Sequence, residues 1–406
     1  MRLIAIFFLS IFSSCILSDE SNQDSYANII LGNEQLNLYT TLLDGKKVGI
    51  VANHTSLIYG KHLVDSLLSL QINIVKIFSP EHGFRGEIEA GELVGNQIDT
   101  QTNLPVISLY GNRKKPANSD IKEVDIMLFD MQDVGVRFYT YISTMHYVME
   151  ACAENGIPLI ILDRPNPNGW YVDGPVLDTN FRSFVGMHPV PLVHGMTIGE
   201  FAQMINGEGW LENKVKCDLT IIKCENYSHD TKYILPVKPS PNLPNQTSIY
   251  LYPSLGFFEG TVISIGRGTD FPFQIFGNPE LPFSGYSFTP ESRPGASANP
   301  PLLGEICNGY DLRDYSYDYF YSLKSINLEW LIYAYKSYPN KDEFFNSYFN
   351  LLAGNSTLKE QIIKGLDADS IRNSWTQEIN SFINCRKKYL LYKDFKTENG
   401  TERGVE

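Results

Sequence analysis

Six short runs of apolar and β-branched residues alternate with helical patterns between Lys47 and Lys223, and this alternation limits the fold more than any other sequence feature. Such alternation is typical of stacked βαβ units, whose strands lie parallel in one sheet. We predict strands at Val48–Ala52, Ile74–Phe78, Pro105–Leu109, Asp125–Phe129, Pro158–Leu162 and Leu219–Lys223. We predict helices at His62–Leu70, Tyr141–Asn155 and Thr197–Trp210. The predicted fold class is therefore α/β, with a Rossmann-like, mostly parallel sheet.

The pattern changes after Cys224, where an irregular, proline-rich connector leads into a part of the chain that is rich in aromatic residues. Further helical patterns lie at Leu328–Tyr338, Lys341–Leu352 and Ala368–Tyr389. With 406 residues and 43% hydrophobic content, the chain is long enough for two domains. We expect a Rossmann-like domain over residues 31–246, a smaller α+β domain over residues 247–395 and a polar tail over residues 396–406.

The first residues have the pattern of an export signal, because Arg2 precedes an apolar run that ends in Ser13-Ser14-Cys15. This ending resembles a bacterial lipoprotein signal, in which Cys15 carries the lipid; the alternative is ordinary secretory cleavage nearby. Residues 1–18 are then a signal and linker. We expect an exported, periplasmic or outer-membrane-associated lipoprotein that contacts the membrane only through Cys15.

Composition and missing motifs exclude several classes of function. A net charge of −13 without a basic cluster is unfavourable for nucleic-acid binding. Ala52-Asn53-His54-Thr55 follows the first predicted strand in place of a Gly-x-Gly-x-x-Gly loop, which disfavours a nicotinamide cofactor. The sequence also lacks a Gly-x-Ser-x-Gly elbow and closely spaced metal ligands. We expect neither a cofactor nor a metal.

Three polar clusters begin where predicted strands end, at residues 79–83, 130–137 and 163–167. Because the carboxyl ends of parallel strands face one crevice, we expect these clusters to form a single site. Glu81 lies in the rigid Pro-Glu-His-Gly segment and is the best candidate for a catalytic acid; the alternative is that it caps a helix or pairs with Arg85. His82 is either catalytic or a structural histidine.

The other candidates come from the remaining clusters and from two glycine-containing segments of the second domain. Asp130, Gln132 and Arg137 suit the hydroxyl groups and carboxylate of an acidic sugar, whereas Asp133 reads as a turn residue. In the third cluster, Asp163 and Arg164 either bind a ligand or form an ordinary surface ion pair. The candidates that have such structural alternatives are Asp163, Arg164, Asn166, His194, Glu259 and Arg267.

Six ordered segments and a closing motif carry a family resemblance. They are Ser79–Gly86 (SPEHGFRG), Leu128–Tyr141 (LFDMQDVGVRFYTY), Leu162–Asn168 (LDRPNPN), Pro191–Gly199 (PLVHGMTIG), Pro239–Pro244 (PSPNLP), Phe258–Thr269 (FEGTVISIGRGT) and Arg386–Tyr389 (RKKY). The chain resembles the exo-β-N-acetylmuramidase family, long known as a domain of unknown function. The resemblance implies release of N-acetylmuramic acid from the non-reducing end of peptidoglycan-derived saccharides, with Glu81 matching the proposed catalytic glutamate.

Glycoside hydrolysis commonly uses two carboxyl groups, and the resemblance leaves the partner of Glu81 open. Asp130, Asp133, Glu259 and the 2-acetamido group of the substrate are the alternatives. The candidates for binding the lactyl carboxylate of muramic acid are Arg137, Arg164 and Arg267. Tyr139 either stacks on a sugar ring or belongs to the core. Two rival functions are a non-catalytic, lipid-anchored binder of cell-wall saccharides and a metal-dependent esterase or amidase.

Overall fold

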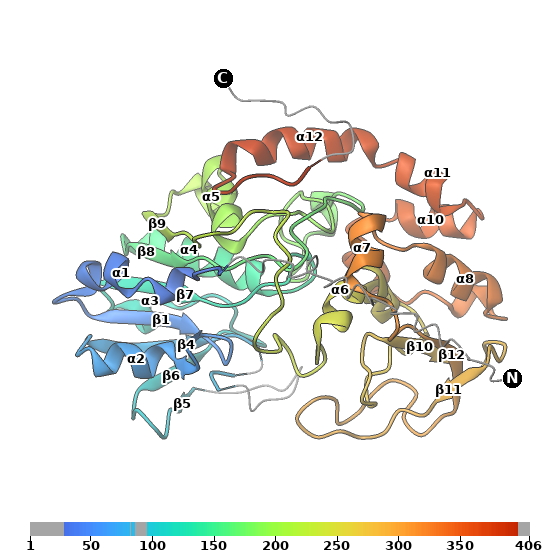
Figure 1. Ribbon diagram of the computed structural model, residues 1–406, viewed down its shortest axis with the longest axis horizontal. Helices are drawn as coiled ribbons and strands as arrows, with labels where there is room; N and C mark the ends of the chain where they lie inside the picture. Colours follow the sequence, from blue (N-terminus) through green and yellow to red (C-terminus); the bar gives the residue numbers. More distant parts are fainter. Residues whose placement is uncertain (1–27, 82, 86–95, 397–406) are drawn as a thin grey trace, which may run out of the picture.

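The computed structural model describes residues 28–81, 83–85 and 96–396, and its N-terminal part contains one seven-stranded sheet (Figure 1). The strands are β1 (Val48–Ala52), β4 (Ile74–Ser79), β5 (Gln97–Ile98), β6 (Pro105–Ser108), β7 (Ile126–Asp130), β8 (Leu159–Leu162) and β9 (Leu219–Ile222). Their order is β5-β6-β4-β1-β7-β8-β9, and β5 alone runs antiparallel to its neighbour. The six predicted strands are confirmed, each to within one residue at either end.

The strand order fixes where a ligand can bind. Counted along the chain, the six parallel strands lie in the order 3-2-1-4-5-6, which is the order of a Rossmann fold. The chain leaves β1 toward β4 on one side and leaves the adjacent strand β7 toward β8 on the other, so the loops that follow β1 and β7 diverge at one edge of the sheet, where the loop after β4 also lies. A crevice is expected at this edge.

Helices cover both faces of the sheet because side chains alternate along buried strands. Ile50, Leu128 and Ile160 pack with α1 (Leu36–Leu43) and α2 (Leu63–Ser69). Val51, Phe129 and Ile161 face the opposite way and pack with α4 (Tyr141–Asn155) and α5 (Ile198–Glu208). The predicted helices are confirmed as α2, α4 and α5, and Thr197 caps α5 in a capping box with Glu200. The remaining short elements are α3 (Asn118–Ile121), β2 (Leu57–Ile58) and β3 (Lys61–His62).

The C-terminal part is of the predicted α+β class and combines helices with a small antiparallel sheet. The sheet has the order β10-β12-β11, formed by β10 (Ile275–Asn278), β11 (Tyr286–Phe288) and β12 (Cys307–Asp311). Its helices are α6 (Gln246–Leu255), α7 (Tyr317–Leu323), α8 (Glu329–Ser337), α9 (Phe349–Ala353), α10 (Thr357–Ile363), α11 (Ala368–Asn373) and α12 (Thr376–Arg386). Short 3₁₀ turns occur at η1 (Gly32–Glu34), η2 (Thr179–Phe181), η3 (Glu212–Lys214), η4 (Gly256–Gly260), η5 (Lys341–Glu343) and η6 (Lys387–Tyr389).

The end of the chain returns to the N-terminal part, where α12 runs toward α5 (Figure 1). The Arg386 guanidinium donates to the carbonyl oxygen of Gly195 at 3.1 Å and pairs with Asp394 at 2.8 Å. The Tyr392 hydroxyl donates to the Asp163 carboxylate at 2.6 Å. The bonds to Gly195 and Asp163 join the last described residues of the chain to the Rossmann-like part.

The helical pattern at Lys341–Leu352 does not form one helix, because the chain forms η5 and α9 with an irregular segment between them. In that segment the Phe344 carbonyl accepts from the Val262 amide, and the Asn346 amide donates to the Gly260 carbonyl. These backbone groups are therefore unavailable to a helix. Pairing with a segment more than 80 residues away overrides the helical pattern.

None of the described helices is long and apolar enough to cross a bilayer. Cys152, Cys217, Cys224, Cys307 and Cys385 all carry free thiols.

Candidate active site

A cavity of about 510 Å³ opens at the predicted edge of the sheet and is lined by both parts of the chain. The loop after β4 contributes Glu81, the connection from β7 to α4 contributes Tyr139, and the first residue of α4 contributes Tyr141. The C-terminal part contributes Tyr252, Glu259 and Arg267, together with other aromatic side chains. The cavity therefore combines two carboxyl groups with hydroxyl donors and ring surfaces, a set suited to a polar, ring-shaped ligand.

Glu81 reaches the cavity from a tight turn. The Gly83 amide donates to the Pro80 carbonyl at 3.3 Å, and Gly83 has a φ of 74°, a conformation that favours glycine. The Arg85 guanidinium, which could have competed for Glu81, binds Asp99 at 2.8 Å and Asp65 at 3.3 Å. The Glu81 carboxyl group is thus half-buried and lies beyond the end of β4, as expected from the sequence. The other candidate of this loop, His82, lies outside the described residues.

Glu259 faces the same cavity and is held by Arg267. The Arg267 guanidinium donates to one Glu259 oxygen at 2.6 and 3.1 Å and lies 5.1 Å from the centre of the Phe273 ring. Burial alone lowers the pKa of Arg267, but Glu259 and then Glu81 raise it overall. The two carboxyl groups and this guanidinium thus form one electrostatic unit.

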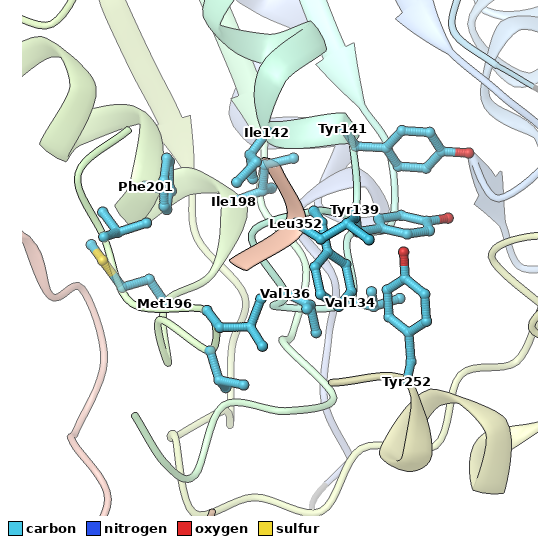
Figure 2. Packing of buried hydrophobic residues seen from close by; sticks show 14 of the residues in the cluster. Val134, Val136, Tyr139, Tyr141, Ile142, Met196, Ile198, Phe201, Tyr252 and Leu352 are labelled. Carbon is cyan, nitrogen blue, oxygen red and sulfur yellow. The ribbon is translucent and has the colours of Figure 1, made fainter. Parts of the chain in front are cut away.

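Three tyrosines form a wall of the cavity, and their hydroxyl groups lie at one end of the apolar cluster (Figure 2). The Tyr139 hydroxyl donates to the Pro239 carbonyl at 2.8 Å, and the Asn53 amide donates to the Tyr141 hydroxyl at 2.8 Å. Burial raises the pKa of Tyr252, and the charges of Glu259 and Glu81 raise it further. The same order of causes raises the pKa of Tyr348 to about 12. Both carboxyl groups therefore act on the same two phenols, which stay protonated and can donate hydrogen bonds.

Asp130 and Arg164 were expected to contact a ligand, but the structure places both away from the cavity. Asp130 is fully buried and Arg164 is 3% exposed, and neither is among the described residues that line the cavity. The Arg164 guanidinium binds both Asp130 oxygens at 2.6 and 3.0 Å, and the Asn33 amide donates to Asp130 at 3.0 Å. The ends of β7 and β8 do converge as predicted, but these two charges neutralise each other beneath the site.

Arg137 also lies outside the set of described cavity residues. Its guanidinium is fully buried and donates to four carbonyl oxygens at 2.7 to 3.0 Å. Two of the carbonyls belong to Pro175 and Val190, and two belong to Leu352 and Ala353. Burial lowers the pKa of Arg137 to about 9. We therefore correct the expectation that it binds a carboxylate, because it joins the two parts of the chain instead.

The remaining candidates from the second and third clusters form a buried network. The side-chain amide of Gln132 donates to the Pro165 carbonyl, and the side-chain amide of Asn166 donates to the Met196 carbonyl. Asp163 accepts from the Thr197 hydroxyl and the Gly199 amide, both at 2.8 Å, and so fixes the start of α5. Burial raises the pKa of Asp163 to about 6. These contacts place the network in the support of the cavity rather than among its described lining residues.

Comparisons with known proteins identify the family. The N-terminal family model described as exo-β-N-acetylmuramidase NamZ matches residues 48–247, and the corresponding C-terminal model matches residues 250–392. The chain belongs to this family. It is also 42% identical over 377 residues to the peptidoglycan β-N-acetylmuramidase NamZ of Bacillus subtilis strain 168, covering 87% of this chain and 89% of the relative.

Two solved structures of DUF1343 family proteins from Bacteroides fragilis share the fold of this NamZ-family chain. One is 48% identical, with a TM-score of 0.85, and the match covers 90% of this chain and 99% of the other. The second is 29% identical, with a TM-score of 0.78, and the match covers 90% and 100% of the two chains. The Rossmann-like sheet and the smaller C-terminal domain predicted for this NamZ-family chain are thus confirmed.

The sequence interpretation missed Lys114, Tyr252 and Tyr348, which line the cavity of this NamZ-family chain. Lys114 had a usable signal, because residues 111–116 form a polar cluster after a predicted strand. Tyr252 and Tyr348 carry no comparable signal, since they are two of 24 tyrosines. Of the predicted candidates, the structure brings Glu81, Tyr139, Glu259 and Arg267 together at the cavity.

His194 provides a pH-dependent prediction. Burial, with smaller effects of Arg386 and Arg137, lowers the pKa of His194 from 6.5 to about 3. Between these values the unfolded chain binds a proton that the folded chain does not, so the free energy of unfolding falls as the pH falls.

A His194→Asn variant keeps an acceptor for the Met196 amide but does not titrate. We expect the stability of the wild type relative to this variant to fall by about 1.4 kcal/mol per pH unit between pH 6 and 4. Urea unfolding at each pH measures the difference, and a constant difference would contradict the assignment.

Proposed function

We propose that this chain is an exo-acting β-N-acetylmuramidase that releases N-acetylmuramic acid from the non-reducing end of peptidoglycan fragments. The main support for the proposal is that Glu81 and Glu259 both line one cavity in a chain of the NamZ family. The name of the Bacillus subtilis relative supports the same reaction and substrate class. Carboxyl groups on two sides of a cavity are the arrangement that glycoside hydrolysis uses most often.

The proposed chemistry starts with Glu81, which donates its proton to the oxygen of the leaving sugar as the glycosidic bond breaks. The bond electrons leave with that oxygen, and positive charge develops on the ring of the muramic acid. Glu259 is the group proposed to stabilise this charge, because Asp130 and Asp133 are buried and are not among the described cavity residues. The 2-acetamido group of the substrate is the alternative partner. Water then bonds to the anomeric carbon and releases one proton, and uptake of a proton returns Glu81 to its acid form.

The tyrosines have a separate part in the proposal. Their raised pKa keeps the Tyr252 and Tyr348 phenols protonated beside the two carboxyl groups. Protonated phenols can donate hydrogen bonds to sugar hydroxyl or acetamido oxygens, while the rings of Tyr139 and Phe273 offer apolar surface to the sugar face. The aromatic wall thereby positions the ring relative to Glu81.

The experiment that tests the proposal compares two chromogenic glycosides, an N-acetylmuramide and the matching N-acetylglucosaminide, each with and without a chelator. We expect release of the chromophore from the muramide, with much less from the glucosaminide and no effect of the chelator. Saturable binding without release would favour the non-catalytic binder, and loss of wall-directed activity on chelation would favour the metal-dependent hydrolase.

We also propose that the chain is exported and anchored through a lipid on Cys15. The support is the sequence pattern of residues 1–15, which lie outside the described part of the chain. Replacing Cys15 with Ala should abolish incorporation of labelled fatty acid in bacterial cells and move the protein from the membrane fraction to the soluble fraction. Lipid labelling that persists in the Cys15→Ala variant would refute the anchor.

A further inference from the structure

The cavity contains two cationic side chains among its described lining residues, Arg267 and Lys114, and their surroundings differ. Arg267 is bound by Glu259 and lies within electrostatic reach of Glu81. A carboxylate from a ligand would meet two negative charges around Arg267. Such like-charge contacts are unfavourable, so Arg267 is better suited to orienting Glu259 than to binding an anion.

Of these two cations, Lys114 has no carboxylate partner among the residues that the structure describes. It forms no ion pair with any residue that the structure describes, although its neighbour Arg113 pairs with Asp120 at 2.9 Å. The Lys114 ammonium instead lies 4.4 Å from the centre of the Phe184 ring, and Phe184 also lines the cavity. A half-buried ammonium held over a ring keeps its three donors available for an anionic ligand.

Helix α4 holds this arrangement in place from behind. Lys115, the next residue, pairs with Glu150 at 2.7 Å and with Glu154 at 2.8 Å, both on α4. Phe184 stacks on Tyr147 of the same helix, with ring centres 6.3 Å apart. The loop that carries Lys114 and the ring beneath its ammonium are thus attached to one rigid element, which reduces the entropy lost when a ligand binds.

We infer that Lys114 binds the carboxylate of the lactyl ether on the substrate and so determines specificity for muramic acid over glucosamine. The inference rests on the proposed function and deepens it. N-Acetylmuramic acid differs from N-acetylglucosamine by this ether, whose carboxylate carries the charge at neutral pH. Lys114 is the cavity cation whose charge is not already compensated by a described carboxylate. From the sequence we expected an arginine to bind this carboxylate; we now assign the contact to a lysine on the loop after β6.

The test compares two aryl N-acetylmuramides, one with a free lactyl carboxylate and one with that group capped as a methylamide. We expect the Lys114→Met variant to lose about 10- to 100-fold in kcat/KM on the free acid, the range for a hydrogen bond to a charged group. The same variant should change by less than about threefold on the capped substrate, because no charged contact is lost there. Lys114→Arg should recover most of the activity on the free acid.

Lys232→Met is a matched control, because the Lys232 ammonium lies 4.3 Å from the centre of the Tyr317 ring and neither residue is among the described cavity residues. It should behave as the wild type on both substrates. Equal losses of Lys114→Met on both substrates would overturn the inference, while wild-type hydrolysis of the muramide would still support the proposed function. Failure of the folded wild type to hydrolyse either muramide would overturn both.

Discussion

Replacing Glu81 with Gln should lower the turnover number on a muramyl disaccharide by about 10²–10⁴-fold, the usual contribution of a positioned acid or base. Glutamine keeps the size and hydrogen-bonding capacity of the side chain but has no proton to donate. Glu81 lies on a turn fixed by the Pro80–Gly83 hydrogen bond, so the variant should keep the loop conformation. Saccharide binding, measured by calorimetry, should therefore survive while hydrolysis is lost.

A comparison of leaving groups separates the role of Glu81 from that of Glu259. An aryl glycoside with an acidic leaving group needs little protonation, so the deficit of Glu81→Gln should shrink on this substrate relative to the disaccharide. Glu259→Gln should instead show a similar deficit on both substrates, because it affects the developing positive charge rather than the leaving oxygen. Near-wild-type hydrolysis of the disaccharide by a folded Glu81→Gln protein would exclude Glu81 as the acid.

Much of the N-terminal fold could be predicted from the sequence because its signals are local. The run Val48–Ala52 is apolar throughout, and every residue of β1 is buried, as expected for a parallel strand covered on both faces. Thr197 and Glu200 form the capping box that starts α5. The helical pattern at Lys341–Leu352 was misleading because the signal that decides its structure is not local. Its backbone hydrogen-bond partners lie at residues 260–262.

The residues that line the cavity could be predicted only in part. The rule that polar clusters after parallel strands converge located Glu81 correctly at the cavity edge. The rule does not tell which side chain faces the cavity and which faces a neighbouring loop. Arg137 shows the problem, since two of its carbonyl partners lie more than 200 residues away in the sequence. Lys114 shows the reverse case, where a polar residue in an ordinary loop faces the cavity.

Asp130 illustrates how a polar motif can serve stability, and it provides the second large expected effect. Asp130→Ala removes one member of a buried pair and leaves the Arg164 charge uncompensated at 3% exposure. Loss of one partner from such a pair costs about 3–5 kcal/mol of the free energy of unfolding. Urea unfolding of the wild type and the variant measures this cost.

Two further variants show whether burial of the charge is the cause. In the double variant Asp130→Ala with Arg164→Met no buried charge remains, so it should recover much of the stability lost by Asp130→Ala alone. Asp311→Ala is a matched control, because Asp311 pairs with Arg313 through the same chemistry at the surface, where such pairs contribute about 0–1 kcal/mol. If Asp130→Ala unfolds with the free energy of the wild type but loses hydrolysis, Asp130 acts on the substrate after all and the ion pair is not its main role. A stability loss that the double variant restores, with the Asp311 variant unaffected, would place the Asp130 and Arg164 motif in the support of the site.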